Sequence, residues 1–148
     1  MKITEEVSIE APVDEVFAVF TDLDSAQRNV TGITAIEVLE GPPRLAVGTR
    51  WRETRPFFGK EATEEMWVTA LDEKRRYVVE AESHGTKYRT EYIFASGDGS
   101  TRVEMTFEGR PVSPSAKLTS GLAFLFRGSL RKALRRDLRD LKAVCESD

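Results

Sequence analysis

The stretch that decides the fold is residues 113–146, SPSAKLTSGLAFLFRGSLRKALRRDLRDLKAVCE. Ser113 is a suitable N-cap, and Pro114 is tolerated as a first helical residue because its missing N–H would have no partner there. Apolar side chains then recur at helical spacing, and the pattern predicts one long amphipathic helix. Its apolar stripe contains Leu118, Leu122, Leu125, Phe126, Leu130, Ala133, Leu134, Leu138, Leu141, Val144 and Cys145. Its opposite side is expected to be charged, with Arg131, Arg135, Asp137 and Arg139 among its members.

The rest of the chain reads mostly as strands, because apolar and polar residues alternate in seven segments. The expected strands are residues 2–10, 33–40, 48–55, 61–71, 75–82, 87–95 and 101–108. Two short helices are expected between the first two strands, at residues 12–20 and 24–28. A long apolar stripe needs a long apolar partner. The sequence therefore predicts an α+β fold, a seven-stranded curved antiparallel sheet wrapped around the C-terminal helix.

Length and composition indicate one soluble globular domain over residues 1–148, with 40% hydrophobic and 32% charged residues. The N-terminus lacks the apolar core of a signal peptide. Cys145 is the single cysteine, so no internal disulfide is possible and a reducing compartment is expected. We therefore expect a cytoplasmic protein, with Cys145 as a packed thiol on the apolar stripe.

Charge is distributed unevenly along the chain. Residues 114–148 carry eight Lys/Arg and four Asp/Glu (+4), which leaves fourteen and twenty-one (−7) for residues 1–113. The basic helix face could meet an anionic membrane or an acidic partner, or it could simply be solvated. We favour the solvated face, and we expect no nucleic-acid partner. The oligomeric state is open.

The sequence offers little for metal or cofactor chemistry. One histidine, His84, and one cysteine cannot build a multi-His or Cys-rich metal site. No G-x-S-x-G, phosphate-binding or H-E-x-x-H motif is present. His84 precedes Gly85 and is interpreted as a turn residue rather than a base. We therefore expect no metal, no cofactor and no evident catalytic group.

Side-chain alternation places aromatic residues on one face of the later strands, where they could form a wall opposite the C-terminal helix. The set could line a ligand pocket or fill a core. Trp51, Glu53 and Arg55 share a face of the third strand, and Glu64 shares a face with Met66. These charges could point into a cavity or lie at its open, wet end, and we favour the wet end. The candidate ligand-binding residues are Trp51, Arg55, Glu64, Met66, Tyr77, Tyr88, Tyr92, Phe94, Met105, Phe107, Leu118, Leu122 and Phe126.

Several segments in a fixed order resemble a known superfamily. They are SIEAPVDEVF at residues 8–17, Gly32-Ile33, the glycine-led GTRW at residues 48–51, and Phe107-Glu108-Gly109 before the capped helix. This order resembles the helix-grip fold of the START-related polyketide cyclase and lipid-transport superfamily, SRPBCC, over essentially the full length. The resemblance implies an elongated cavity between sheet and helix that holds an apolar or amphipathic small molecule.

Two functions follow as hypotheses. The first is non-catalytic binding or carriage of a hydrophobic small molecule such as a lipid, quinone or polyketide-like compound. The alternative is an enzyme of the aromatase/cyclase or dehydratase type, in which Arg55, Tyr92 or Glu64 positions the substrate or transfers protons. The sequence alone does not separate these two hypotheses.

Overall fold

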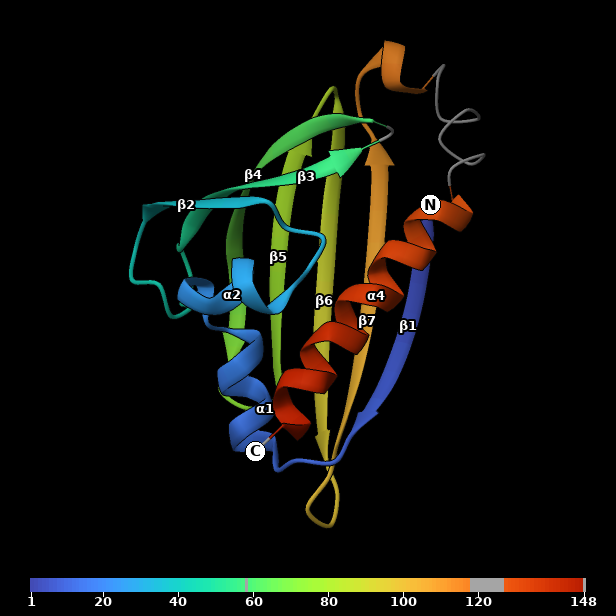
Figure 1. The fold of residues 1–148 in the computed structure, drawn as a ribbon. Helices are drawn as coiled ribbons and strands as arrows, with labels where there is room; N and C mark the ends of the chain where they lie inside the picture. The colour runs from blue at the N-terminus through green and yellow to red at the C-terminus, as the bar shows by residue number, and fades with distance from the viewer. Residues whose placement is uncertain (58, 118–126, 148) are drawn as a thin grey trace.

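A computed structural model describes residues 1–57, 59–117 and 127–147. Within them, seven strands form one antiparallel sheet in the order β1-β7-β6-β5-β4-β3-β2 (Figure 1). The strands are β1 (Lys2–Ile9), β2 (Ala35–Glu40), β3 (Arg50–Phe57), β4 (Lys60–Asp72), β5 (Arg76–Ser83), β6 (Thr86–Ser96) and β7 (Thr101–Pro111). The helices are α1 (Val13–Phe20), α2 (Leu23–Asn29) and α4 (Arg127–Glu146). The predicted strands and both short helices are confirmed, with ends shifted by up to three residues.

The antiparallel order follows from short turns between consecutive strands. Strands β5 and β6 are joined by His84 and Gly85, whose φ angles of 51° and 77° are both positive. Two central residues with positive φ make a type I′ turn, which matches the twist of a β-hairpin. Ser83 and Thr86 are paired across this turn. The interpretation of His84 as a turn residue is therefore confirmed.

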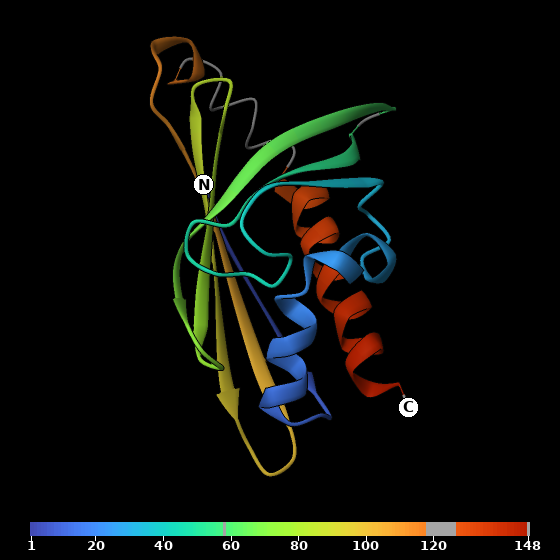
Figure 2. The ribbon, with the colours of Figure 1, turned by 90° about the vertical axis from the view of Figure 1, so that its left-hand side faces the viewer.

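The described helices α1, α2 and α4 lie on one side of the curved sheet, and α4 crosses it obliquely (Figure 2). We call the side that they cover the inner face. The hydrophobic core lies on this face and contains side chains from the strands and from the helices α1, α2 and α4. Phe17 of α1 belongs to this core, with 1% of its surface exposed. The Phe17 ring packs edge-on against Phe94 and Tyr77, with ring centroids 5.1 and 6.1 Å apart. Thus α1 fills one end of the space between sheet and helix.

The C-terminal segment begins as predicted. The Ala116 N–H donates to Ser113 Oγ at 3.1 Å, so Ser113 is an N-cap, and residues 114–117 form a helical turn. This turn lies at the β5–β6 hairpin, where the N–H groups of Val112 and Ser113 donate to the Gly85 carbonyl. Among the described residues after this turn, helix α4 begins at Arg127. The part of the predicted helix that contains Leu118, Leu122 and Phe126 lies outside the described residues.

The apolar stripe of α4 faces the sheet as expected, with Leu138 and Cys145 buried. The prediction for Asp137 is wrong, because this residue does not lie on the solvated side. Its side chain is only 14% exposed. Asp137 follows Leu134 by three residues and precedes Leu141 by four, and both spacings put side chains on the same face of a helix. The carboxylate of Asp137 therefore lies on the side of α4 that faces the sheet, among the apolar residues of the stripe.

Removing the Phe17 ring should strongly destabilise the protein. We expect Phe17→Ala to lower the free energy of unfolding by about 3–5 kcal/mol, because it removes a fully buried ring and leaves a cavity. Urea denaturation measures the change. Val47→Ala is the control, since Val47 is 63% exposed and its loss should change little. Equal effects of the two substitutions would contradict the assigned core.

Candidate functional site

A cluster of three charged side chains connects β3 to α4. Arg55 Nε donates to Glu53 Oε2 at 2.7 Å, and Arg55 Nη1 contacts Asp137 Oδ2 at 2.9 Å. Glu53 and Arg55 are two residues apart on one strand and therefore share its inner face. Their side chains are 9% and 31% exposed. We call Glu53, Arg55 and Asp137 the ion cluster.

The wet-end interpretation of these charges is therefore wrong for Glu53 and Arg55. Alternation along the strand is compatible with either placement, and the contact with Asp137 decides between them. Because Asp137 supplies a second carboxylate beneath α4, the guanidinium of Arg55 is held between two partners. A charge with such partners can be buried at an acceptable free energy.

Burial and the neighbouring charges shift the protonation of this cluster. Burial raises the pKa of Asp137 to about 6, an effect that Glu53 strengthens and the Arg55 guanidinium reduces. Burial opposes the charge on Arg55, but Glu53 and Asp137 outweigh it and raise the pKa of the guanidinium. With both carboxylates ionised, the ion cluster carries one surplus negative charge. Loss of water around Asp137 is therefore the main reason why it holds its proton more tightly than an exposed aspartate would, and the nearby carboxylate of Glu53 adds to this effect.

Aromatic rings lie against the ion cluster. Tyr77 and Tyr92 stack with ring centroids 4.6 Å apart, and Phe20 packs edge-on against Tyr92 at 6.0 Å. Trp51 Nε1 donates a long hydrogen bond of 3.4 Å to Glu53 Oε1. Tyr77 donates an equally long one to the Phe20 carbonyl. The ion cluster is thus bordered by aromatic side chains, and one of them, Trp51, donates to Glu53.

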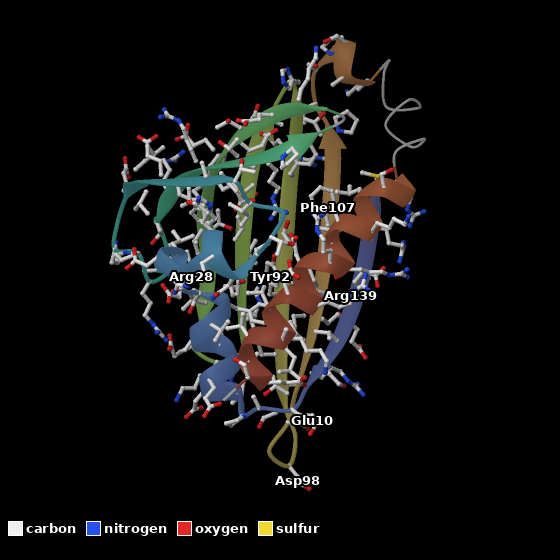
Figure 3. The ribbon with its side chains drawn as sticks, viewed as in Figure 1. Glu10, Arg28, Tyr92, Asp98, Phe107 and Arg139 are labelled. Atoms are coloured by element: carbon white, nitrogen blue, oxygen red, sulfur yellow. The ribbon has the colours of Figure 1, made fainter. Side chains whose placement is uncertain are left out.

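Tyr92 is a partly accessible aromatic residue beside the ion cluster. Figure 3 shows it at mid-height of the sheet, between α2 and α4 in that view. Its ring is partly buried against the core. Burial first, and then the charges of Asp137 and Glu53, raise the pKa of its hydroxyl, which therefore stays protonated. Among the described residues, none forms a hydrogen bond with this hydroxyl.

A second polar group lies on the inner face further along β4 and β6. Glu64 is the cross-strand partner of Glu53 and is half-buried, and burial raises the pKa of its carboxyl group. Tyr88 stacks on Phe107 with ring centroids 5.7 Å apart. Figure 3 places Phe107 on β7 near the start of α4. Aromatic and acidic side chains therefore continue from the ion cluster toward that end of the sheet.

The structure brings most of the predicted site residues together on the inner face, as the pairing registers of β3 to β7 require. Those that are buried are Trp51, Tyr77, Phe94 and Met105. Those that remain partly accessible are Arg55, Glu64, Met66, Tyr88, Tyr92 and Phe107. Leu118, Leu122 and Phe126 lie outside the described residues. Sequence reasoning missed Asp137, although its spacing from Leu134 and Leu141 was a usable signal.

The basic side of α4 is partly used within the chain. Arg131 and Arg135 both donate to Glu5 Oε1 of β1, each at 2.8 Å. Burial of Glu5 opposes its charge, but the two guanidinium groups outweigh this and lower the pKa of its carboxyl group. Figure 3 shows Arg139 on the side of α4 toward β1. Two residues of the expected basic surface thus anchor the helix to the sheet.

Two shallow depressions lie along α4 and away from the aromatic residues. One follows the seam with β1 and is lined by Glu5, Glu6, Val7, Arg135, Leu138 and Arg139. The other is lined by Ser129, Lys132, Ala133, Arg136 and Arg139 of the helix itself. Neither contains a predicted ligand-binding residue. The candidate site therefore rests on the inner-face side chains and not on these depressions.

Other kinds of site find little support in the described part of the chain. It contains no group of three or more His, Cys, Asp or Glu residues placed to hold a metal ion. No described helix is long and apolar enough to cross a membrane. Burial raises the pKa of the Cys145 thiol to about 11, so this residue is a packed thiol and not a ready nucleophile.

Comparison with known proteins places the chain in a structural context. The family model described as polyketide cyclase / dehydrase and lipid transport matches residues 1–146. No curated protein sequence matches the chain. Many solved structures share the fold. Their low sequence identity supports similarity of fold alone.

Three of these structures illustrate the range of proteins that share the fold. The Zhui aromatase/cyclase from Streptomyces sp. R1128 has a TM-score of 0.81 at 16% identity, covering 99% of this chain and 93% of that one. A protein from Thermus thermophilus has a TM-score of 0.79 at 19% identity, covering 97% and 95%. Norcoclaurine synthase from Thalictrum flavum, in complex with dopamine and hydroxybenzaldehyde, has a TM-score of 0.72 at 14% identity, covering 97% and 85%. The helix-grip architecture predicted from the sequence is therefore confirmed.

Removing the cation of the ion cluster should destabilise the protein more than removing an exposed cation. We expect Arg55→Gln to lower the free energy of unfolding by about 3 kcal/mol at neutral pH, since it leaves Glu53 and Asp137 without a counter-charge. Arg52→Gln on the same strand is the matched control, because Arg52 meets Glu37 on the solvated side at 3.7 Å. Urea denaturation of both variants checks this, and a smaller effect for Arg55→Gln would contradict a buried cluster.

Protonation of Asp137 should be visible directly. Carboxyl-carbon NMR is expected to show Asp137 titrating near pH 6 rather than near its ordinary value of 3.8. The folded state then binds this proton more tightly than the unfolded state, so the contribution of Asp137 to stability falls as pH rises between these values. The fall is on the order of 3 kcal/mol. It should be absent in Asp137→Asn, and a midpoint near pH 4 would contradict the assignment.

Proposed function

Because the chain belongs to the polyketide cyclase / dehydrase and lipid-transport family, we propose that it binds a hydrophobic small molecule between the inner face and α4. The family description joins enzymes with transport proteins. Ligand binding is the property that both roles require, and it therefore needs the fewest assumptions about this chain. We propose binding or carriage as its function.

The observation that carries this proposal is the incomplete burial of apolar side chains on the inner face. Ile36, Met66, Val79, Tyr92 and Leu134 pack against the core but stay partly accessible. Apolar surface left in contact with water is unfavourable by about 25 cal/mol per Å². A bound apolar molecule would cover this surface and gain that free energy. Ligand sites in proteins combine such a lining with a few polar groups.

The aromatic residues favour a flat or ring-containing ligand. Tyr77 and Tyr92 are stacked, and Tyr92 offers partly accessible ring surface beside the ion cluster. Offset stacking of aromatic rings contributes free energy beyond the area that it buries. Polyketide-like aromatics and quinones suit this surface better than a saturated lipid chain would. We therefore place them first among the ligand classes.

A second candidate function is enzymatic, and Asp137 is the specific observation that favours it. Its pKa of about 6 lies close to neutral pH, where a general acid or base transfers protons efficiently. Arg55 and Tyr92 lie beside it and could bind the carbonyl groups of a polyketide-like chain. In that case Asp137→Asn should retain substrate binding and lose turnover. Binding without any turnover of a polyketide-like substrate by the native protein would favour carriage.

Filling the accessible space should block binding without unfolding the protein. We expect apolar aromatic ligands to raise the Tm of the native protein and Val79→Phe to abolish that rise. For the native protein, a ligand at a hundred times its Kd adds about 2.7 kcal/mol to the free energy of unfolding. If the proposal holds, the apo stability of the variant should hardly change, because the new ring then occupies the space that the ligand would fill.

Ile93→Phe is the matched control for this experiment. Ile93 lies on the outer face with 41% of its surface exposed, so its ligand response should equal that of the native protein. If the inner face is instead a filled core, Val79→Phe should destabilise the apo protein by about 1–3 kcal/mol through overpacking. That loss, together with no ligand response from the native protein, would contradict the proposal.

A further inference from the structure

The charges on the inner face are unbalanced at the place where the proposed ligand would lie. Each packed element contributes: β3 provides Glu53 and Arg55, β4 provides Glu64, α4 provides Asp137, and β1 provides Glu5. The charge of Glu5 is already compensated, because Arg131 and Arg135 both form ion pairs with it. Three carboxylates then remain around Tyr92 and Met66. They face the guanidinium of Arg55 and, at Asp137, that of the exposed Arg136, so one negative charge is in excess.

Arg55 cannot compensate all three carboxylates. Its Nε is taken by Glu53 at 2.7 Å and its Nη1 by Asp137 at 2.9 Å. Glu64 is directly opposite Glu53 in the β3–β4 register, and like charges in that arrangement repel. In the described part of the chain, Glu64 forms no ion pair, and the Ser83 side chain and His84 only partly offset the burial that raises the pKa of its carboxyl group. The carboxylate oxygens on the inner face therefore outnumber the donors that the neighbouring side chains offer them.

We infer that the bound molecule presents an uncharged or positively charged hydrogen-bond donor, a hydroxyl or an amine, to these carboxylates, and that the site excludes ligands with a carboxylate. This inference rests on the proposed function and deepens it. A donor group can satisfy the free acceptor positions of Asp137 or Glu64. A carboxylate would bring a further negative charge into a partly buried region that already holds surplus negative charge, where repulsion is stronger than in water.

The aromatic residues fit the same ligand chemistry. The Tyr92 hydroxyl is free of hydrogen bonds to described residues and can accept one from a ligand hydroxyl or amine. The partly accessible ring of Tyr92 also attracts a cation where it is removed from water. Fatty acids are therefore poor ligands, whereas phenols, alcohols and aromatic amines are good ones. Among the ring compounds proposed above, those that carry hydroxyl groups are preferred to unsubstituted quinones, which have no donor.

A matched ligand series tests the inference. Naphthylethanol, naphthylethylamine and naphthylacetate share one ring system, and decanol, decylamine and decanoate share one chain. Calorimetric Kd values at neutral pH should be at least about tenfold lower for each donor ligand than for its carboxylate counterpart. Asp137→Asn removes one negative charge and should narrow that ratio by about tenfold. Glu104→Gln, the same charge change on the outer side of β7, should leave the ratio unchanged.

The outcomes distinguish the inference from the function on which it rests. If the carboxylates bind as tightly as the donors, the protein is a ligand-binding protein and the inference is overturned. If none of the six molecules binds to native protein, the proposed function fails and the inference fails with it. An equal narrowing by Asp137→Asn and Glu104→Gln would attribute the preference to net charge, which also overturns the role of the inner face. Thermal melting of both variants establishes that each is folded.

Discussion

The attachment of α4 to the sheet by ion pairs on two sides is the constraint on which the inner face depends. On one side Glu5 of β1 holds Arg131 and Arg135, and on the other Arg55 of β3 holds Asp137. These contacts fix the helix across the sheet through long side chains. The apolar residues of the strands between them need not all reach α4. Met66, Val79 and Tyr92 stay partly accessible as a result.

The alternation of residues along the strands was sufficient to predict most of the site. Tyr77, Tyr92 and Met105 come from three strands, but each lies on the inner face because side chains repeat every two residues and the registers align them. Ser113 was recognisable as an N-cap and His84 as a turn residue from local chemistry alone. These features depend on neighbours in the sequence or on a fixed period, and such information is present in a single chain.

The ion cluster could not be predicted in the same way. Arg55 and Asp137 are 82 residues apart in the sequence, and the local pattern around either residue does not predict contact with the other. A charged residue on an alternating strand can face a wet opening or a buried partner, and the choice depends on where the helix lies. The contact between Arg55 and Asp137 decides that choice here. The pKa shift of Asp137 and the surplus negative charge both follow from this long-range contact.

The central claim is that the inner face, beneath α4, holds an apolar ligand. Intermolecular NOEs test it most directly, between a bound naphthyl ligand and the methyl groups of selectively labelled Met66, Val79 and Ile93. We expect strong NOEs from the ligand ring to Met66 and Val79 and none to Ile93, which lies on the outer face of the sheet. NOEs to Ile93 alone, or none to Met66 and Val79 at saturating ligand, would contradict the claim.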